Sequence, residues 1–142
     1  METMNHEYYV SPEIAKLLEK VGFDWKCRKC YNKGVLFDME PDEIRTQTPQ
    51  HSSYDVLAPT LEVAQRWLRE VKNLVISIHY DPTIKSQPYA YSIYDVEEKF
   101  DDILGIISPV THSYSDGYFY KYEEAQEAGI KKAVEILLKE GK

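Results

Sequence analysis

The clearest helical pattern in this chain runs from Leu61 to Val71. Apolar residues recur there at steps of three and four and form one stripe, while charged and amide side chains fill the other side. Thr60 precedes the stripe and can accept a hydrogen bond from an amide of the first turn, and Asn73 is suited to end a helix. The pattern predicts a capped amphipathic helix with Trp67 in the core.

Two strands are expected after this helix. The β-branched, apolar run over residues 74–80 predicts a buried strand, and the alternation over 89–96 predicts a second strand that pairs with it in antiparallel fashion. The acidic stretch 97–104 fits a short helix or a turn, and residues 108–117 are typical of a loop. A third short strand is expected at 118–120.

Further elements are expected near both ends of the chain. Ser11 followed by Pro12 predicts a helix start, since serine is a good cap and proline fits the first turn. A last helix is expected over residues 121–139, with small residues on its inner face. Imperfect alternation over 23–32, a turn and the apolar triplet 35–37 predict a hairpin between these two helices.

This order of elements predicts an α+β fold. We expect a small antiparallel sheet of about three to five strands with two or three helices packed on one face. The length of 142 residues suits a single domain over 1–142. Residues 1–8 are expected to be a frayed N-terminus, and 38–58 a long loop that holds a short helix near 41–44.

Charge and hydropathy narrow the class of protein. The net charge of −7 argues against sequence-independent binding to nucleic acid, which needs a basic surface. No apolar run approaches the roughly 18 residues of a membrane span, and no secretory leader is visible. Two cysteines in a chain able to form a core fit a reducing compartment. These observations predict a cytoplasmic protein with no membrane partner.

The unusual feature of the composition is its twelve tyrosines. Tyrosine favours strands and suits surfaces on which one end of the side chain stays wet. A sheet surface rich in tyrosine in an acidic chain predicts recognition of a protein partner or self-association. The expected interaction surface consists of Tyr89, Tyr91, Tyr94, Tyr118 and Tyr120.

One short stretch combines basic and aromatic residues and supports an alternative function. It lies in the expected hairpin, and such residues can contact phosphates and stack on bases. The alternative is therefore a nucleic-acid-binding accessory protein. Its contacts would come from Trp25, Lys26, Arg28, Lys29, Tyr31 and Lys33.

Cys27 and Cys30 form a CxxC motif that could be ordinary, metal-binding or redox-active. A zinc site needs two further ligands, and only His51 follows nearby. A redox motif would precede a helix, whereas a turn follows here. The incomplete ligand set favours two ordinary reduced cysteines and no metal.

No motif for catalysis or cofactor binding is present. No serine has the glycine pattern of a nucleophile elbow, and no phosphate loop or dinucleotide fingerprint occurs. The sequence therefore predicts a protein that is not an enzyme, with no cofactor and no catalytic residue. A third hypothesis is a hydrolase or metal enzyme that uses His79, His112 and the acidic cluster over 95–102.

Three stretches also resemble a known group of sequences. They are Tyr9-Val10-Ser11-Pro12-Glu13, the helix stretch PTLEVAQRWLRE from residue 59, and YEEAQEAGI from residue 122. The pattern is similar to short hypothetical proteins of gut Bacteroidetes and their prophages. The resemblance implies a small cytoplasmic accessory protein of a mobile element. The group has no established activity, so it implies no catalytic residue.

Overall fold

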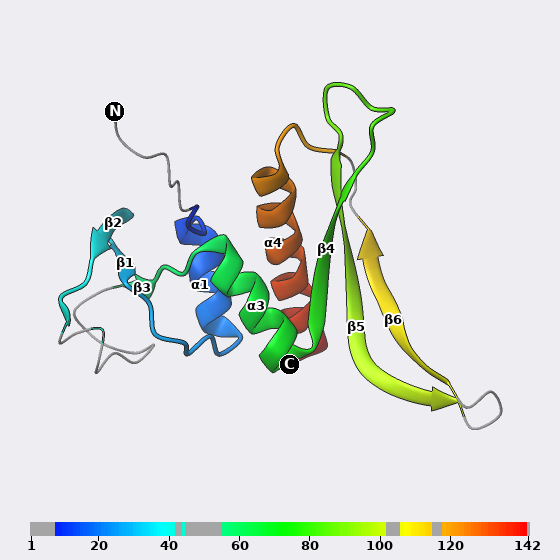
Figure 1. Cartoon of the computed structure of the whole chain (residues 1–142). Helices are drawn as coiled ribbons and strands as arrows, with labels where there is room; N and C mark the ends of the chain where they lie inside the picture. The colour runs from blue at the N-terminus through cyan, green and yellow to red at the C-terminus, as the bar shows by residue number, and fades with distance from the viewer. Residues whose placement is uncertain (1–7, 42–43, 45–54, 102–105, 115–117, 142) are drawn as a thin grey trace.

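Three helices and two small antiparallel sheets make up the part of the chain that the computed structural model describes, and they confirm the α+β class. The described residues are 8–41, 44, 55–101, 106–114 and 118–141. The helices lie between the two sheets, so the molecule has a layered arrangement (Figure 1). Within the described residues, no helix is long and apolar enough to cross a membrane.

The central helix α3 (Leu61–Lys72) forms where the amphipathic pattern predicted it. The Thr60 hydroxyl accepts a hydrogen bond from the Val63 N–H at 3.1 Å, and Asn73 ends the helix in the left-handed conformation at φ 60°. Val71 is the exception to the predicted stripe, because its side chain is exposed. The last turn of the helix therefore projects beyond the core.

The two other helices also form where the sequence predicted them. Helix α1 (Pro12–Lys20) begins at Ser11, whose hydroxyl accepts a hydrogen bond from the Ile14 N–H at 3.2 Å. Helix α4 (Tyr122–Glu140) is the longest of the described helices and packs against both α1 and α3. Small residues on its inner face let it come close to the larger sheet, and Gly129 marks the closest approach.

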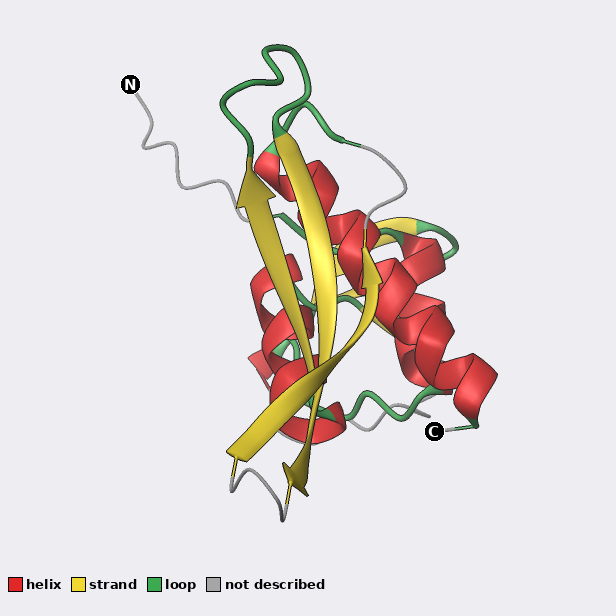
Figure 2. Ribbon diagram, turned by 90° about the vertical axis from the view of Figure 1, so that its right-hand side faces the viewer, coloured by secondary structure: helices red, strands yellow, loops and turns green. Residues whose placement is uncertain are grey.

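The larger sheet consists of β4 (Leu74–Tyr80), β5 (Tyr89–Asp101) and β6 (Ile106–Tyr114), in the order β4-β5-β6. The predicted antiparallel pairing of β4 with β5 is confirmed, with Ile76 opposite Ile93. The helices cover one face of this sheet, and no described helix covers the other (Figure 2).

Two predictions for the second half of this sheet are wrong. The acidic stretch 97–104 was expected to be a short helix or a turn, but β5 continues through it as far as Asp101. The expected loop over 108–117 instead contains most of β6. Strand pairing between β5 and β6 outweighs the local preference of the acidic and polar residues.

Pro109 explains why β6 is not evident in the sequence. Proline lacks an N–H and is confined to edge strands or irregular pairings. Strand β6 is an edge strand, and its register with β5 shifts between Asp95 and Lys99. The strand expected at 118–120 is reduced to a single bridge between Phe119 and Tyr89.

The smaller sheet has the order β2-β1-β3 and lies beyond α1 (Figure 1). Strands β1 (Lys29–Asn32) and β2 (Val35–Asp38) form the predicted hairpin, although β1 begins at Lys29 and not at residue 23. Lys33 and Gly34 both have positive φ, 54° and 79°, as a tight two-residue hairpin turn requires.

The third strand of this sheet corrects the expected long loop. Strand β3 (Val56–Leu57) pairs with β1 inside the segment 38–58, where no strand was predicted. The expected short helix at 41–44 is described only at Pro41 and Ile44, which are both helical. Residues 42–43 and 45–54 of that segment, and residues 1–7 of the expected frayed N-terminus, lie outside the described residues.

One apolar core joins the layers. Trp67 is 1% exposed, which confirms its predicted place in the core, and Phe23 meets its ring edge-on with centroids 5.3 Å apart. Gln126 is the buried polar residue of α4, and its side-chain amide donates to the Gln65 side chain at 2.8 Å. Gln65 in turn donates to the Ile76 carbonyl on β4 at 2.8 Å.

Candidate functional site

The structure divides the predicted tyrosine surface among three places. Tyr91 is only 5% exposed, because α4 packs on it, so it belongs to the core and not to the surface. Tyr94 is opposite Val75 and lies on the other face of the sheet, away from the helices. Tyr118 and Tyr120 are exposed, as predicted for an interaction surface.

The exposed tyrosines gather at the end of the molecule where α4 begins. We call this set the tyrosine rim; its members are Tyr8, Tyr80, Tyr118, Tyr120 and Tyr122. Tyr80 and Tyr120 are each 62% exposed. Tyr89 connects the rim, because its ring centroid lies 5.4 Å from that of Tyr80 and 6.1 Å from that of Tyr122. Four segments far apart in the sequence therefore meet at this end.

A cleft of about 520 Å³ opens beside the tyrosine rim, between α1 and the first turns of α4. The Tyr8 carbonyl accepts a hydrogen bond from the Leu61 N–H at 2.8 Å, and this bond holds the chain before α1 at the cleft. Four apolar side chains line it together with Tyr8: Ile14, Leu61, Phe119 and Ala128. The remaining lining residues are charged: Lys121, Glu123, Glu124, Glu127 and Lys131.

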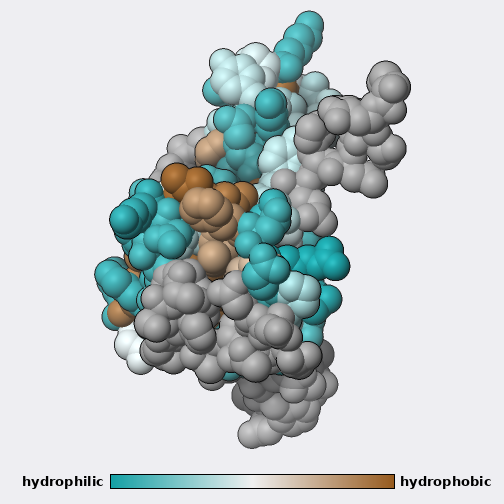
Figure 3. Space-filling view, turned by 90° about the vertical axis from the view of Figure 1, so that its left-hand side faces the viewer, coloured by the Kyte–Doolittle hydropathy of each residue, from teal (hydrophilic) through white to brown (hydrophobic). Residues whose placement is uncertain are grey.

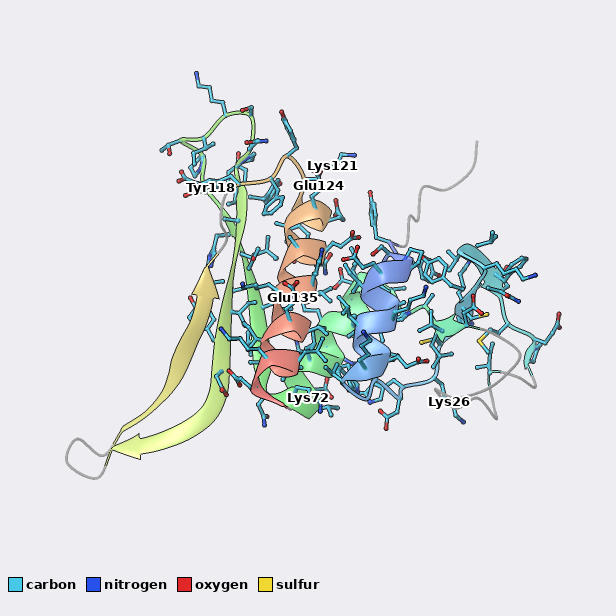
Figure 4. All side chains as sticks on the ribbon, turned by 180° about the vertical axis from the view of Figure 1, so that it is seen from behind. Lys26, Lys72, Tyr118, Lys121, Glu124 and Glu135 are labelled. Carbon is cyan, nitrogen blue, oxygen red and sulfur yellow. The ribbon has the colours of Figure 1, made fainter. Side chains whose placement is uncertain are left out.

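Two of these charged side chains, Lys131 and Glu124, have defined partners. Lys131 Nζ lies 2.8 Å from Glu13 Oε1, and this contact raises the pKa of the lysine. Glu124 Oε1 accepts a hydrogen bond from the Lys121 N–H at 3.0 Å, which ties down the start of α4. Figure 4 shows Lys121 and Glu124 at this end of the helix, near Tyr118.

Glu127 is a further carboxylate of the cleft and is half-buried. Burial raises the pKa of its carboxyl, so the surroundings disfavour the charged form. No described residue forms an ion pair with it. The cleft therefore combines an apolar lining with a half-buried carboxylate, Glu127, that has no ion-pair partner among the described residues.

The basic-aromatic hairpin does not present the aromatic side chains that the alternative function needs. Tyr31 is buried, and its hydroxyl donates to the Val10 carbonyl at 2.6 Å. Trp25 is half-buried, with the Arg66 guanidinium 4.9 Å from its ring centroid.

Only some of the basic residues of this hairpin are exposed and could contact a phosphate group. Lys26, Arg28 and Lys33 are exposed. Lys29 Nζ lies 3.1 Å from Asp38 Oδ1, so its charge is compensated across the hairpin. Of the six residues named for this function, three exposed basic side chains remain, whereas Tyr31 is buried and Trp25 is half-buried.

The CxxC cysteines are both buried and form no disulfide. Burial, together with the nearby Cys30, raises the pKa of the Cys27 thiol to about 12. A thiol of that kind is protonated at neutral pH and is a poor nucleophile. Among the described residues, no three His, Cys, Asp or Glu side chains converge as a metal site. His51 lies outside the described residues.

The residues of the hydrolase hypothesis do not assemble into a described catalytic group. His79 Nε2 and the Ser92 hydroxyl share a hydrogen bond of 2.9 Å across β4 and β5. No described carboxylate is hydrogen-bonded to His79, as the base of a catalytic triad would require. His112 belongs to β6, and Asp102 of the acidic cluster lies outside the described residues.

A second exposed apolar spot lies on the smaller sheet. The space-filling view of this side of the molecule shows an apolar patch surrounded by polar residues (Figure 3). Val35 and Phe37 are the exposed apolar residues of β2, which is an edge strand. Neither Val35 nor Phe37 lines either of the two clefts in the described part of the chain.

Sequence reasoning missed several residues of the rim and the cleft. Tyr8 was assigned to a frayed end, and nothing in the pattern placed both Tyr80 and Tyr122 against Tyr89. The only signal for Glu127 was its place in the acidic first half of the last helix. These residues come together only through the packing of α1 and α4.

Comparisons with known proteins give no match. No family model, no curated protein and no solved structure matches this chain. The resemblance to short proteins of gut Bacteroidetes stays a prediction, and function has to be argued from the geometry of the rim and the cleft.

Proposed function

We propose that this protein is a small, non-catalytic interaction module that binds a protein partner through the tyrosine rim. The observation that carries the proposal is the gathering of exposed tyrosines at one end of the molecule, beside a cleft that Tyr8 lines. Tyrosine is enriched in protein interfaces, since its large ring buries much apolar area at a low cost in side-chain entropy.

The arrangement supports binding to a protein better than binding to nucleic acid. The cleft beside the rim is lined by carboxylates, and the chain carries a net charge of −7. Both repel phosphate groups. Tyr31 is buried and Trp25 is covered by Arg66, so neither ring can stack on a base. Binding to nucleic acid through this hairpin would then depend on the exposed Lys26, Arg28 and Lys33. The reduced, buried cysteines support a cytoplasmic location for the module.

Site-specific photo-crosslinking tests the proposal. A benzophenone amino acid is placed at position 120, and the protein is irradiated in an extract of its source cells. We expect one discrete adduct of defined mass. Untagged wild-type protein should compete for its formation, and the variant Tyr80→Ser/Tyr120→Ser should compete about tenfold less well, since truncating an interface aromatic typically costs 1 kcal/mol or more.

The matched control places the same amino acid at position 71. Val71 is also exposed and apolar, but it lies in the last turn of α3, at the far end of that helix from the rim. The proposal requires that this position give no competed adduct. Equal adducts from both positions, or none from position 120, would contradict it.

A further inference from the structure

We infer that the cleft beside the tyrosine rim binds a lysine or arginine side chain within an extended, partly apolar segment of the partner. This inference rests on the proposed function and names the chemistry that the partner must bring. The observation behind it is that Glu127 lies half-buried in the partly apolar cleft and has no ion-pair partner among the described residues.

The apolar part of the cleft fits the stem of a long basic side chain. Ile14, Leu61 and Ala128 provide aliphatic contacts, and Phe119 and Tyr8 provide rings. Lysine and arginine bury their methylene stems on such surfaces while their charged heads reach a polar group. A cation held near these rings would gain further attraction from their π faces.

The charges of the cleft favour a cation over an anion. Glu13 pairs with Lys131, which leaves three glutamates of α4 against Lys121 in the lining, so negative charge dominates the potential of the cleft. Burial raises the pKa of the Glu127 carboxyl and so disfavours its charged form. A cation within about 4 Å would lower this pKa and stabilise the carboxylate. A segment of the partner with a lysine or arginine supplies that cation and covers the apolar lining at the same time.

A second copy of this chain is a poorer occupant. Each copy carries a net charge of −7, so two copies repel one another at low ionic strength. The same charge would steer a basic partner toward the cleft and raise its rate of association. We therefore assign the cleft to a foreign segment.

The test measures binding of a short fluorescein-labelled peptide in which lysine and leucine alternate, by fluorescence anisotropy at physiological salt. A matched peptide carries glutamine in place of lysine. We expect the lysine peptide to bind at least about fivefold more tightly than the glutamine peptide. Glu127→Gln should weaken its binding by about fivefold or more, as the loss of a charge-assisted contact predicts.

The control variant is Glu135→Gln, which makes the same change of charge on α4 but outside the cleft, at an exposed position farther along the helix (Figure 4). It should leave the affinity within about twofold of the wild type. Equal weakening by both variants would mean general attraction to an acidic protein and would overturn the inference. Equal binding of both peptides would also overturn it.

Sedimentation of the unliganded protein tests whether a second copy of this chain occupies the cleft. A dimer that Glu127→Gln abolishes would place a second copy in the cleft and overturn the assignment to a foreign segment. Failure of the lysine peptide to bind, with the crosslink from position 120 intact, would reject this inference and leave the proposed function standing. Loss of that crosslink would reject the proposed function separately.

Discussion

Gly129 is the residue at which α4 and the larger sheet come closest. A Cβ atom added there would lie 2.7 Å from Ile76 Cγ2 and 3.3 Å from Tyr91 Cγ. Neither atom is the far end of a flexible side chain, so the helix or the sheet would have to shift. The absence of a side chain at this position therefore sets the spacing between the helix layer and the sheet, and with it the position of the rim.

Gly129→Ala should lower the free energy of unfolding by about 1–3 kcal/mol, as overpacking of a core does. In an open helix the same change would raise stability by about 1 kcal/mol, because alanine has the better helix propensity. Denaturant unfolding measures whether Gly129→Ala lowers or raises the free energy of unfolding. Ala128→Gly, one residue away, provides a reference for the effect of propensity. A stabilised Gly129→Ala variant would mean that α4 does not approach the sheet this closely.

Cys27 gives a prediction of pH dependence. Its thiol pKa is about 12 in the folded protein against an ordinary value of 9.0, because burial disfavours the thiolate. The unfolded chain therefore loses this proton at lower pH than the folded chain does. The stability that Cys27 contributes is fully present below pH 9 and is lost as the pH rises from 9 toward 12.

The readout uses the Cys30→Ser variant, which leaves Cys27 as the one thiol of the chain. Native protein at pH 8 should react with a thiol reagent at least about tenfold more slowly than protein in denaturant, because a buried, protonated thiol is inert. Fast reaction of the native protein would show that Cys27 is accessible as a thiolate and would revive the redox hypothesis.

At the scale of elements, the pair Gln65 and Gln126 joins α3, α4 and β4. The Gln65 amide donates to the Ile76 carbonyl on the edge strand, and its oxygen accepts from Gln126. These bonds satisfy polar groups at the point where the two helices meet the sheet. They also explain how a glutamine can lie in the core of α4 without an unsatisfied side chain.

Gln65→Ala should lower the free energy of unfolding by about 1–3 kcal/mol, since it removes the acceptor at 2.8 Å from the buried Gln126 amide, which keeps only the longer contact of 3.4 Å to Glu62, and removes the Gln65 donor from the Ile76 carbonyl. Arg69→Ala on the same helix is the control. Arg69 is half-exposed, and its ion pair among the described residues is with Glu70, so its loss should change stability by less than about 0.5 kcal/mol. Thermal or urea unfolding measures both variants, and equal effects would contradict the role of the pair.

At the scale of the whole molecule, the layers decide where a partner can bind. The helices lie between the sheets, so the sheet face that carries Tyr91 is covered and cannot serve as the interaction surface. The tyrosines that remain exposed sit where the ends of β4 and β5 meet the start of α4. The crosslinking and peptide experiments belong to this scale, because each depends on segments that only the complete fold brings together.

The local elements could be predicted because their signals are local. The caps at Ser11 and Thr60, the αL residue Asn73 and the turn at Lys33 and Gly34 each satisfy backbone groups within a few residues. The sequence by itself therefore determined the three helices, the hairpin and the pairing of β4 with β5. Its interaction hypothesis, with Tyr118 and Tyr120 as members, stays a prediction for the experiments above.

Tertiary structure alone decided the length of β5, the existence of β6 and β3, and the membership of the rim. The strand partners of these segments are distant, and pairing energy overrides weak local preference, as at Pro109. Whether a tyrosine is buried depends on what packs over it, so alternation could not distinguish Tyr91 under α4 from Tyr89 at the helix end. The cleft exists because α1 and α4 meet, a contact between opposite ends of the chain.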